Sequence, residues 1–322
     1  MIIDGHNDLV LRSWRGEPVW HVDLARAAEA DFSGGFFAIY VPSPHPDELP
    51  EIPYSMPLAA RIATEEAARV ANELYATLLD LPVTLATSVD DFKPGRVTAI
   101  AHLEGADPLA PDLSDLERWY ERGIRSIGPV WSRPNAFGEG VPFAFPSSPD
   151  LGKGLSPAGF ELVRVCNRLG ILVDLSHLNE QGFWDVAEAS CAPLVASHSN
   201  VHALCPSSRN LTDRQLDAIG KSGGIVGINF AVTFLRADGD QLPDETPLKE
   251  IVRHVDYIAK RIGIDHVAFG SDFDGAVVPT ELDGIAGFPK LVAALGDAGY
   301  DDDALAKITH VNWLRVLDAT WK

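Results

Sequence analysis

Six side chains that can bind a metal ion or move a proton stand where apolar segments of the chain give way to polar ones. Imidazole and carboxylate groups are the usual protein ligands of Zn²⁺ and similar divalent ions, and both also act as general acids and bases. These types in these places predict metal-assisted hydrolysis. The six residues are His6, Asp8, Glu104, His177, His198 and Asp272.

The pair at the start of the chain follows a short apolar stretch, and its members are two residues apart. In extended backbone such residues face the same side, so His6 and Asp8 can point at one ion. An HxD pair is a weak signal alone, because two unrelated polar residues often have this spacing. Its position at the end of a buried first strand favours metal ligation.

The number of candidate ligands exceeds the need of one catalytic zinc, which takes three protein ligands and a water. It suits two divalent ions about 3.5–4 Å apart. Glu104 has two oxygens and is expected to bridge them, with His6 and Asp8 completing one ion and His177 and His198 the other. Two such ions lower the pKa of a shared water, so that a bridging hydroxide exists near neutral pH.

Two further residues have expected roles in cleaving an amide. Asp272, at a strand end, is placed to take a proton from water and return it to the departing amine. Arg209 follows His198 by eleven residues and carries a forked set of donors that suits a substrate carboxylate.

Each of these residues also has a structural interpretation. A histidine can be a core residue bonded to a backbone carbonyl, and a carboxylate can be a helix cap or a surface charge. That reading must explain five strand ends as coincidence. His202 forms an HxxxH pair with His198, but the Cys205-Pro206 pair argues against a helix there, so His198 is preferred. His102 is expected to be a hydrogen-bonded interior residue.

The segments that must position these residues alternate between strand and helix patterns, which predicts an α/β fold: one (β/α)8 TIM barrel domain over residues 1–322. In such a barrel the functional residues lie at the carboxyl ends of the strands. Long Pro-rich loops near residues 42–57 and 132–154 are expected over that face. A short extra strand is expected at 82–86. The barrel strands are expected at 1–4, 35–41, 97–103, 124–130, 171–175, 193–196, 224–230 and 266–270. Helices are expected at 22–30, 57–79, 112–122, 156–169, 179–190, 212–222, 248–262 and 288–321.

Composition narrows the range of partners. The net charge of −20 disfavours nucleic acid and anionic membranes but not a small substrate. No apolar run reaches the ~18 residues of a membrane helix, and the start of the chain lacks a signal-peptide pattern, so a cytoplasmic protein is expected. Cys166, Cys191 and Cys205 show no CxxC spacing, which indicates neither a disulfide scaffold nor a thiolate zinc site.

Five segments resemble motifs of the membrane (renal) dipeptidase family, a binuclear zinc branch of the amidohydrolase superfamily. In chain order they are IDGHND, HLEG, RLGILVDLSH, PLVASHSNVHALCPSSRNLTD and VAFGSDFDG. Together they extend over nearly the whole chain, and the combination is highly specific.

The resemblance implies a zinc dipeptidase with two Zn²⁺ ions bridged by Glu104 and a water or hydroxide. It assigns His6 and Asp8 to one ion and His177 and His198 to the other. It also implies Asp272 as the acid/base group and Arg209 as the partner of the substrate's carboxylate. Bacterial relatives often accept a D-residue at the carboxy-terminal position. Mammalian relatives are disulfide-linked dimers anchored to membranes. No such anchor is expected in this chain, so a homodimer would be non-covalent.

The chain departs from the family at one position. After the fourth strand the renal enzyme has a histidine that contacts the substrate carbonyl, and this chain has Trp131 there. An indole has a single N–H donor and no charge, so carbonyl polarisation falls on the metal or another donor. Asn135 and Arg133, in the adjoining loop, are candidate substrate contacts.

Two other functions remain open on the residues alone. One is a binuclear amidohydrolase acting on another small amide, such as an N-acyl amino acid or a cyclic amide. The other is a metal-binding barrel without catalysis.

Overall fold

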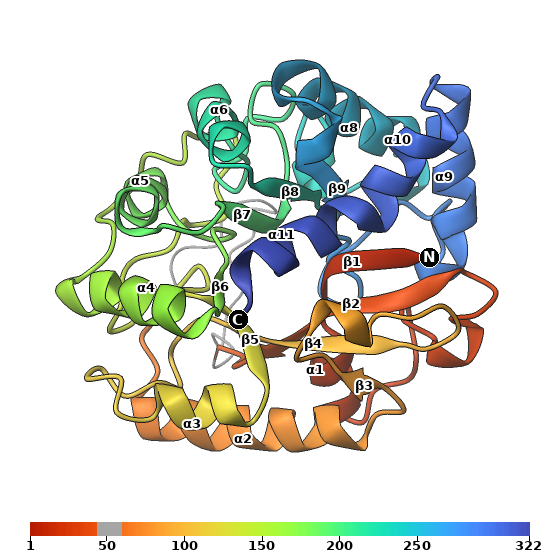
Figure 1. Cartoon of the computed structure of the whole chain (residues 1–322). Helices are drawn as coiled ribbons and strands as arrows, with labels where there is room; N and C mark the ends of the chain where they lie inside the picture. The colour runs from red at the N-terminus through yellow and green to blue at the C-terminus, as the bar shows by residue number, and fades with distance from the viewer. Residues whose placement is uncertain (44–59) are drawn as a thin grey trace.

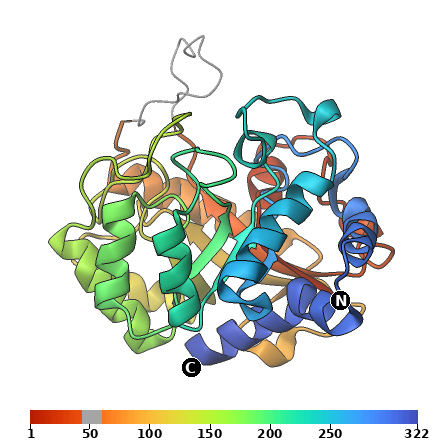
Figure 2. The ribbon, with the colours of Figure 1, turned by 90° about the horizontal axis from the view of Figure 1, so that it is seen from above.

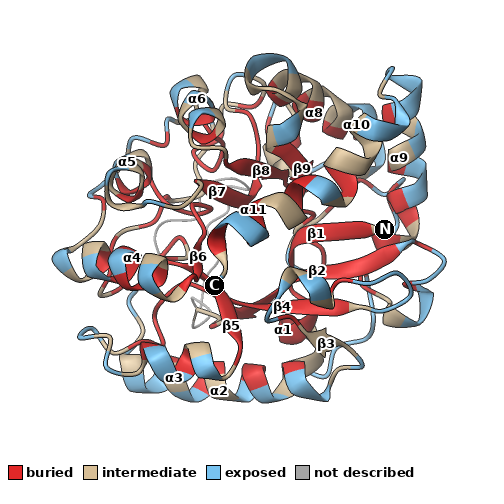
Figure 3. Ribbon diagram, in the orientation of Figure 1, coloured by how far each residue is buried: buried red, intermediate tan, exposed pale blue. Residues whose placement is uncertain are grey.

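The computed structural model describes residues 1–43 and 60–322 of the chain (Figure 1). Most of the predicted loop at 42–57 and the first residues of the helix predicted at 57–79 lie outside the described residues. Within the described residues the strands are buried and the helices expose their outer faces (Figure 3).

Eight parallel strands follow one another around a barrel in chain order. Ladder hydrogen bonds join the first five in the order β1-β2-β4-β5-β6 and the last three in the order β7-β8-β9. Single bridges, Asp174 with Val195 and Asn7 with Phe273, connect the two groups and close the barrel. The predicted (β/α)8 barrel is therefore confirmed. The strands are β1 (Ile2–Asn7), β2 (Phe32–Tyr40), β4 (Thr98–Glu104), β5 (Ile124–Gly128), β6 (Leu172–Val173), β7 (Val195–Ser199), β8 (Ile225–Ile228) and β9 (Val267–Phe269).

Helices surround the strands and bury their apolar faces against them (Figure 1). The predicted cap of α4 is observed, because the Ser156 side chain accepts a hydrogen bond from Gly159 N and Pro157 begins the helix. The helices are α1 (Leu9–Trp14), α2 (Thr64–Asp80), α3 (Leu116–Glu121), α4 (Pro157–Leu169), α5 (Glu180–Ala189), α6 (Asp213–Lys221), α7 (Val232–Leu235), α8 (Lys249–Ile262), α9 (Phe288–Asp297), α10 (Asp302–Ala306) and α11 (Asn312–Thr320).

One end of the barrel is filled with apolar side chains. Each barrel strand except β5 contributes one buried residue to a cluster there, and α11 adds Trp313, Val316 and Leu317. The Trp313 indole N–H donates to Phe269 O at 3.0 Å. Figure 2 shows α11 on the opposite side of the molecule from the loops that follow β5 and β8. Polar side chains can therefore gather only at the other end.

Several predicted elements differ from those observed. The segment 22–30 contains only a 3-10 turn at Leu24–Arg26, because Asp23 caps a single turn. The helix predicted at 288–321 is divided near Gly299, whose φ of 103° breaks α9 from α10, and a π-helical turn at Lys307–Val311 precedes α11. Helices α1 and α7 were not predicted. The extra strand is confirmed as β3 (Thr84–Leu85), which pairs with β4 outside the barrel path.

None of the helices in the described residues combines the length and the apolar character that crossing a bilayer requires.

His254 on α8 joins two segments that border the polar end of the barrel. Its Nδ1 accepts from Val201 N at 3.1 Å, and its Nε2 lies 3.0 Å from Leu235 O at the end of α7. Nε2 must therefore carry the proton of a neutral ring. Burial lowers the pKa of His254 to about 4.

This burial predicts a pH-dependent loss of stability as the pH falls. The pKa of a histidine in the unfolded chain is about 6.5. Between pH 6.5 and 4, residue 254 is therefore protonated in the unfolded chain but still neutral in the native protein. The free energy of unfolding should fall over this window by at most about 3 kcal/mol from this residue. His254→Gln can keep both hydrogen bonds without titrating, so its stability should fall less steeply.

Urea unfolding from pH 7.5 to 4.5, with chelator present so that metal release does not contribute, measures the difference. At pH 7.5 the two proteins should differ by about 1 kcal/mol or less. Parallel curves for the two proteins would contradict the prediction.

Candidate metal centre

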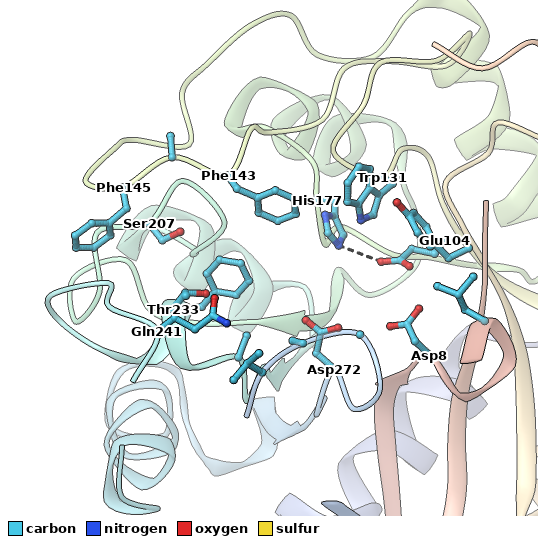
Figure 4. Close-up of a pocket in the computed structure, with 18 residues that line it drawn as sticks. Asp8, Glu104, Trp131, Phe143, Phe145, His177, Ser207, Thr233, Gln241 and Asp272 are labelled. Carbon is cyan, nitrogen blue, oxygen red and sulfur yellow. Dashed lines mark ion pairs between the residues drawn. The ribbon is translucent and has the colours of Figure 1, made fainter. Parts of the chain in front are cut away.

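The barrel brings all six predicted metal-binding and proton-transfer residues to the same end. His6 and His198 belong to β1 and β7, Glu104 is the last residue of β4, and the other three follow β1, β6 and β9 directly or within four residues. Figure 4 shows Asp8, Glu104, His177 and Asp272 from four different strand ends around one cavity. Parallel strands in a closed barrel place their carboxyl ends at one rim, which is why such distant residues meet.

Glu104 lies between two pairs of side chains. Its Oε2 is 3.7 Å from His6 Nε2, which is 3.3 Å from Asp8 Oδ2. Its Oε1 is 3.0 Å from His177 Nε2 and 3.6 Å from His198 Nε2. Each pair forms with Glu104 a group of three potential ligand atoms within 4.8 Å of one another. A third such group, His6 with His198 and Asp272, connects the two, so the six residues form one continuous cluster.

The residues present fit divalent cations. The two Nε2 atoms of His177 and His198 are only 3.0 Å apart, and Arg209 Nη2 donates to the first of them at 3.3 Å. Because arginine only donates, His177 Nε2 must present its lone pair. Both nitrogens of His6 are buried without a hydrogen-bond partner. Lone pairs and carboxylates that face one another out of water require a positive charge between them.

The pKa values of the three histidines in the cluster are shifted by burial and by the neighbouring charges. Burial alone would lower the pKa of His6, but the carboxylates of Glu104, Asp8 and Asp272 raise it to about 10. Burial lowers the pKa of His177 and His198 well below the usual value, so both are neutral rings. A neutral imidazole is the form that binds a metal ion.

Asp272 lies at the edge of the cluster and has a fixed orientation. Its backbone adopts a left-handed φ of 60°, and its N–H donates to His6 O at 3.1 Å. Asn229, after β8, donates from Nδ2 to Asp272 Oδ2 at 2.8 Å, which leaves Oδ1 of this cavity-lining residue without that partner. Burial raises the pKa of Asp272. Sequence reasoning missed Asn229, although a polar residue ending an apolar strand was a usable signal.

Arg209 is buried beside the cluster. Its Nη2 donates to His177 Nε2 and to His198 O, both at 3.3 Å, while its Nε has no hydrogen-bond partner. Its guanidinium carbon lies 5.5 Å from the centre of the Phe234 ring. Arg209 forms no ion pair with a carboxylate of residues 1–43 or 60–322. A buried guanidinium with donors to spare can bind an incoming carboxylate.

The predicted substrate contacts in the loop after β5 have different positions. Trp131 lines the cavity and packs against Tyr40, Phe143 and His177, with ring centres 5.1, 5.6 and 5.7 Å away. Asn135 does not line it. The amide of Asn135 donates to Pro129 O at 2.9 Å and accepts from a backbone N–H, so it holds the loop together.

Arg133, the other candidate in this loop, is fully buried and does not line the cavity. It forms an ion pair with Asp107 at 2.9 Å and donates to Val41 O and Ser43 Oγ. His202 Nε2 lies 2.8 Å from Ser147 O, outside the cluster. His102 Nδ1 lies 2.9 Å from Ser126 Oγ inside the barrel, in the interior role that was expected.

The cavity above the cluster has a volume of about 360 Å³ and mixes polar and apolar surfaces. Its polar lining includes Asp8, Glu104, His177 and Asp272, and its walls are largely aromatic and aliphatic (Figure 4). A small polar molecule with apolar groups fits this combination. The aromatic wall residues are Tyr40, Trp131, Phe143, Phe145 and Phe234.

Comparison with known proteins gives concordant matches. The family model described as "Membrane dipeptidase (Peptidase family M19)" matches residues 1–322. A crystal structure of a Rhodobacter sphaeroides metallo peptidase, liganded with a phosphinate mimic of the dipeptide L-Ala-D-Ala, superposes with a TM-score of 0.95. It is 45% identical, and the match covers 99% of each chain.

Two sequence relatives are also similar. A Klebsiella pneumoniae protein named "Uncharacterized protein in pqqA 5'region" is 50% identical over 74% of this chain and 88% of its own. The dipeptidase verJ of Clonostachys rogersoniana is 31% identical over 99% of this chain and 84% of its own.

The cluster predicts that metal binding stabilises the fold and depends on Glu104. After removal of metal by a chelator, added Zn²⁺ should raise the melting temperature of the native protein. A ligand at a hundredfold excess over its Kd contributes about 2.7 kcal/mol. Glu104→Gln replaces one oxygen of the carboxylate that the two groups share with an amide N–H₂ and removes the negative charge, so most of this rise should be lost. Glu121→Gln, on the exposed end of α3, is the control. An unchanged rise in Glu104→Gln would contradict the prediction.

Proposed function

Because the chain belongs to the membrane dipeptidase family (peptidase family M19) and is a metallo-dipeptidase, we propose that it hydrolyses dipeptides at a centre of two Zn²⁺ ions. The observation that carries the proposal is the sharing of Glu104 between the pair of His6 and Asp8 and the pair of His177 and His198. These five residues are the proposed ligands: His6 and Asp8 would hold one ion, the two later histidines would hold the other, and Glu104 would be shared by both.

When bound, the two ions supply an activated water at neutral pH and polarise the scissile carbonyl. Asp272 provides the proton transfer. Its Oδ2 is held by Asn229 at 2.8 Å, so Oδ1 is the atom that accepts the proton of the attacking water. The same oxygen returns the proton to the departing amine nitrogen. The raised pKa of Asp272 suits a group that must hold a proton between these two steps.

Arg209 binds the carboxylate of the carboxy-terminal residue. Its buried guanidinium has an unpartnered Nε and lies against His177 and Phe234, next to the candidate ligands. A carboxylate held there sets the distance from the chain end to the scissile bond, which favours dipeptides over longer peptides.

The aromatic wall completes the substrate site. Trp131, Phe143 and His177 pack against one another, and the two apolar rings cover one side of the candidate metal cluster, where they exclude bulk water and favour apolar side chains of the substrate. The related Rhodobacter sphaeroides enzyme binds a mimic of a dipeptide that ends in D-alanine. We extend this acceptance of a carboxy-terminal D-residue to the present chain.

The remaining proposals concern the whole protein. Residues 1–322 form one catalytic domain, which the match of one family model over that range supports. The three cysteines are unpaired, as is typical of proteins in the reducing cytoplasm, where we place the enzyme. Any homodimer is non-covalent for the same reason.

A substrate panel with zinc-loaded protein tests the proposed activity. It contains L,L and L,D dipeptides, tripeptides, N-acetyl amino acids and cyclic amides. We expect hydrolysis of dipeptides, including the L,D pairs.

Asp272→Asn should retain both metal ions and lose about 10²- to 10⁴-fold in kcat, because the substitution removes proton transfer but leaves the proposed ligands in place. Cleavage of N-acetyl amino acids alone would refute a dipeptidase. Near-normal kcat in Asp272→Asn would refute its acid/base role.

The role of Arg209 predicts a substrate-dependent effect. Arg209→Met keeps much of the volume but removes the charge, so KM for a dipeptide should rise about 10- to 100-fold, corresponding to the ~1.5–3 kcal/mol of a charged hydrogen bond. The corresponding dipeptide amide, which lacks the carboxylate, should be affected little. Arg214→Met on the exposed face of α6 is the control, and metal content is measured in both variants. Equal losses on dipeptide and amide would argue against carboxylate binding.

A further inference from the structure

A chain of buried hydrogen bonds lies behind His198, on the side away from the cavity. It begins at Asp174, which follows β6, and passes through Ser197 to the histidine ring. These three residues are at most 1% exposed. Neither Asp174 nor Ser197 lines the cavity, and neither belongs to the groups of candidate ligands.

The carboxylate of Asp174 accepts hydrogen bonds from two backbone N–H groups and from the Ser197 hydroxyl. Its Oδ1 accepts from the backbone N–H groups of Ser176 at 3.1 Å and Ser197 at 2.8 Å. Its Oδ2 accepts from the Ser197 hydroxyl at 2.5 Å, and His102 Nε2 lies farther away at 3.6 Å. A carboxylate only accepts hydrogen bonds, so the single hydroxyl proton of Ser197 must point at Asp174.

The direction of the Ser197 hydroxyl proton determines which nitrogen of the His198 ring carries a proton. Ser197 Oγ lies 2.8 Å from His198 Nδ1, and having given its proton to Asp174 it can only accept there. The proton of neutral His198 therefore sits on Nδ1. Nε2 is left with its lone pair directed at Glu104 and His177, 3.6 and 3.0 Å away.

The backbone at this point is also held in place. The Ser197 carbonyl oxygen projects to the centre of the barrel, where a Cβ added at Gly5, Gly227 or Gly270 would come within 2.2, 1.9 or 1.9 Å of it. Only residues without a side chain allow this approach. The strand carrying His198 therefore cannot shift easily to compensate for a lost hydrogen bond.

We propose that Asp174 and Ser197 are positioning residues that hold His198 in the tautomer and orientation needed to bind the metal ion. The proposal rests on the proposed function, because it concerns one of the same ligands. His177 has a separate support: its Nδ1 lies 3.0 Å from Ser132 Oγ and its Nε2 accepts from Arg209. Groups that orient a metal-bound histidine typically change metal affinity about 10- to 100-fold when they are removed.

Substitution of Asp174 by asparagine gives an unusual expectation. The two backbone N–H donors at Oδ1 require an acceptor, so the asparagine oxygen must take that place and the N–H₂ must face Ser197. Ser197 Oγ then accepts from asparagine and turns its own proton towards His198 Nδ1. The histidine is driven to carry its proton on Nε2, the atom that should bind the metal ion.

Ser197→Ala has a milder expected effect, because it only leaves Nδ1 unpartnered and imposes no wrong tautomer. In the double variant Asp174→Asn with Ser197→Ala the reversed hydroxyl is absent, so affinity should return to that of Ser197→Ala. Recovery on adding a second substitution is not expected from a merely structural role of either residue.

The test measures Zn²⁺ affinity by titrating metal-free protein in competition with a chromophoric chelator, with circular dichroism to monitor the fold. Ser197→Ala should weaken Zn²⁺ binding at the site that includes His198 about 10-fold, and Asp174→Asn should weaken it about 100-fold. The double variant should match Ser197→Ala. Ser126→Ala removes a buried hydroxyl whose hydrogen-bond partner, within residues 1–43 and 60–322, is His102 and not a candidate ligand, and it should bind Zn²⁺ as the native protein does.

Native-like Zn²⁺ affinity in both single variants would overturn the inference, as would a double variant weaker than Asp174→Asn. If Asp174→Asn does not fold, native affinity in Ser197→Ala suffices to overturn it and a tenfold loss supports it. These outcomes are distinct from failure of the proposed function, in which the native protein itself binds no Zn²⁺ or cleaves no dipeptide.

Discussion

Carboxylates and imidazole lone pairs buried side by side must be compensated by positive charge, and this constraint governs the polar end of the barrel. Glu104 lies within 3.7 Å of three histidine rings, and His6 has no hydrogen-bond partner for either nitrogen. Removing such groups from water costs several kcal/mol each unless they are paired. The opposite end of the barrel, filled from the strands and α11, provides the packing that offsets this cost.

The rigidity of the site follows from where its residues are attached. His6, Glu104 and His198 belong to strands, and His177 and Asp272 adopt left-handed φ values of 69° and 60° just after strands. Residues with such conformations are strained and persist only where surrounding contacts hold them. Asn229 supplies such a contact to Asp272, and Ser132, Arg209 and the backbone N–H of Val141 supply them to His177.

Much of this arrangement could be predicted because it is local in the sequence. Each barrel strand is an apolar run, and the residue type at its end is visible directly, so the rim could be assembled before any coordinates were known. Partners that meet only in three dimensions could not. The burial of Arg133 depends on its ion pair with Asp107, which the sequence does not reveal. Asn135 stabilises its own loop by a hydrogen bond to Pro129 O, which is likewise seen only in the structure. The split of the last helix near Gly299 depends on one backbone angle that neighbouring helical patterns conceal.

A carboxylate that serves two groups of ligands also makes them interdependent. Glu104 carries a single negative charge, and its oxygens face His6 on one side and His177 and His198 on the other. Whatever one oxygen binds withdraws electron density from the other, so occupancy on one side alters affinity on the other, and linkage makes that influence mutual. At the proposed two-ion centre, binding of one ion would therefore change the affinity for the other.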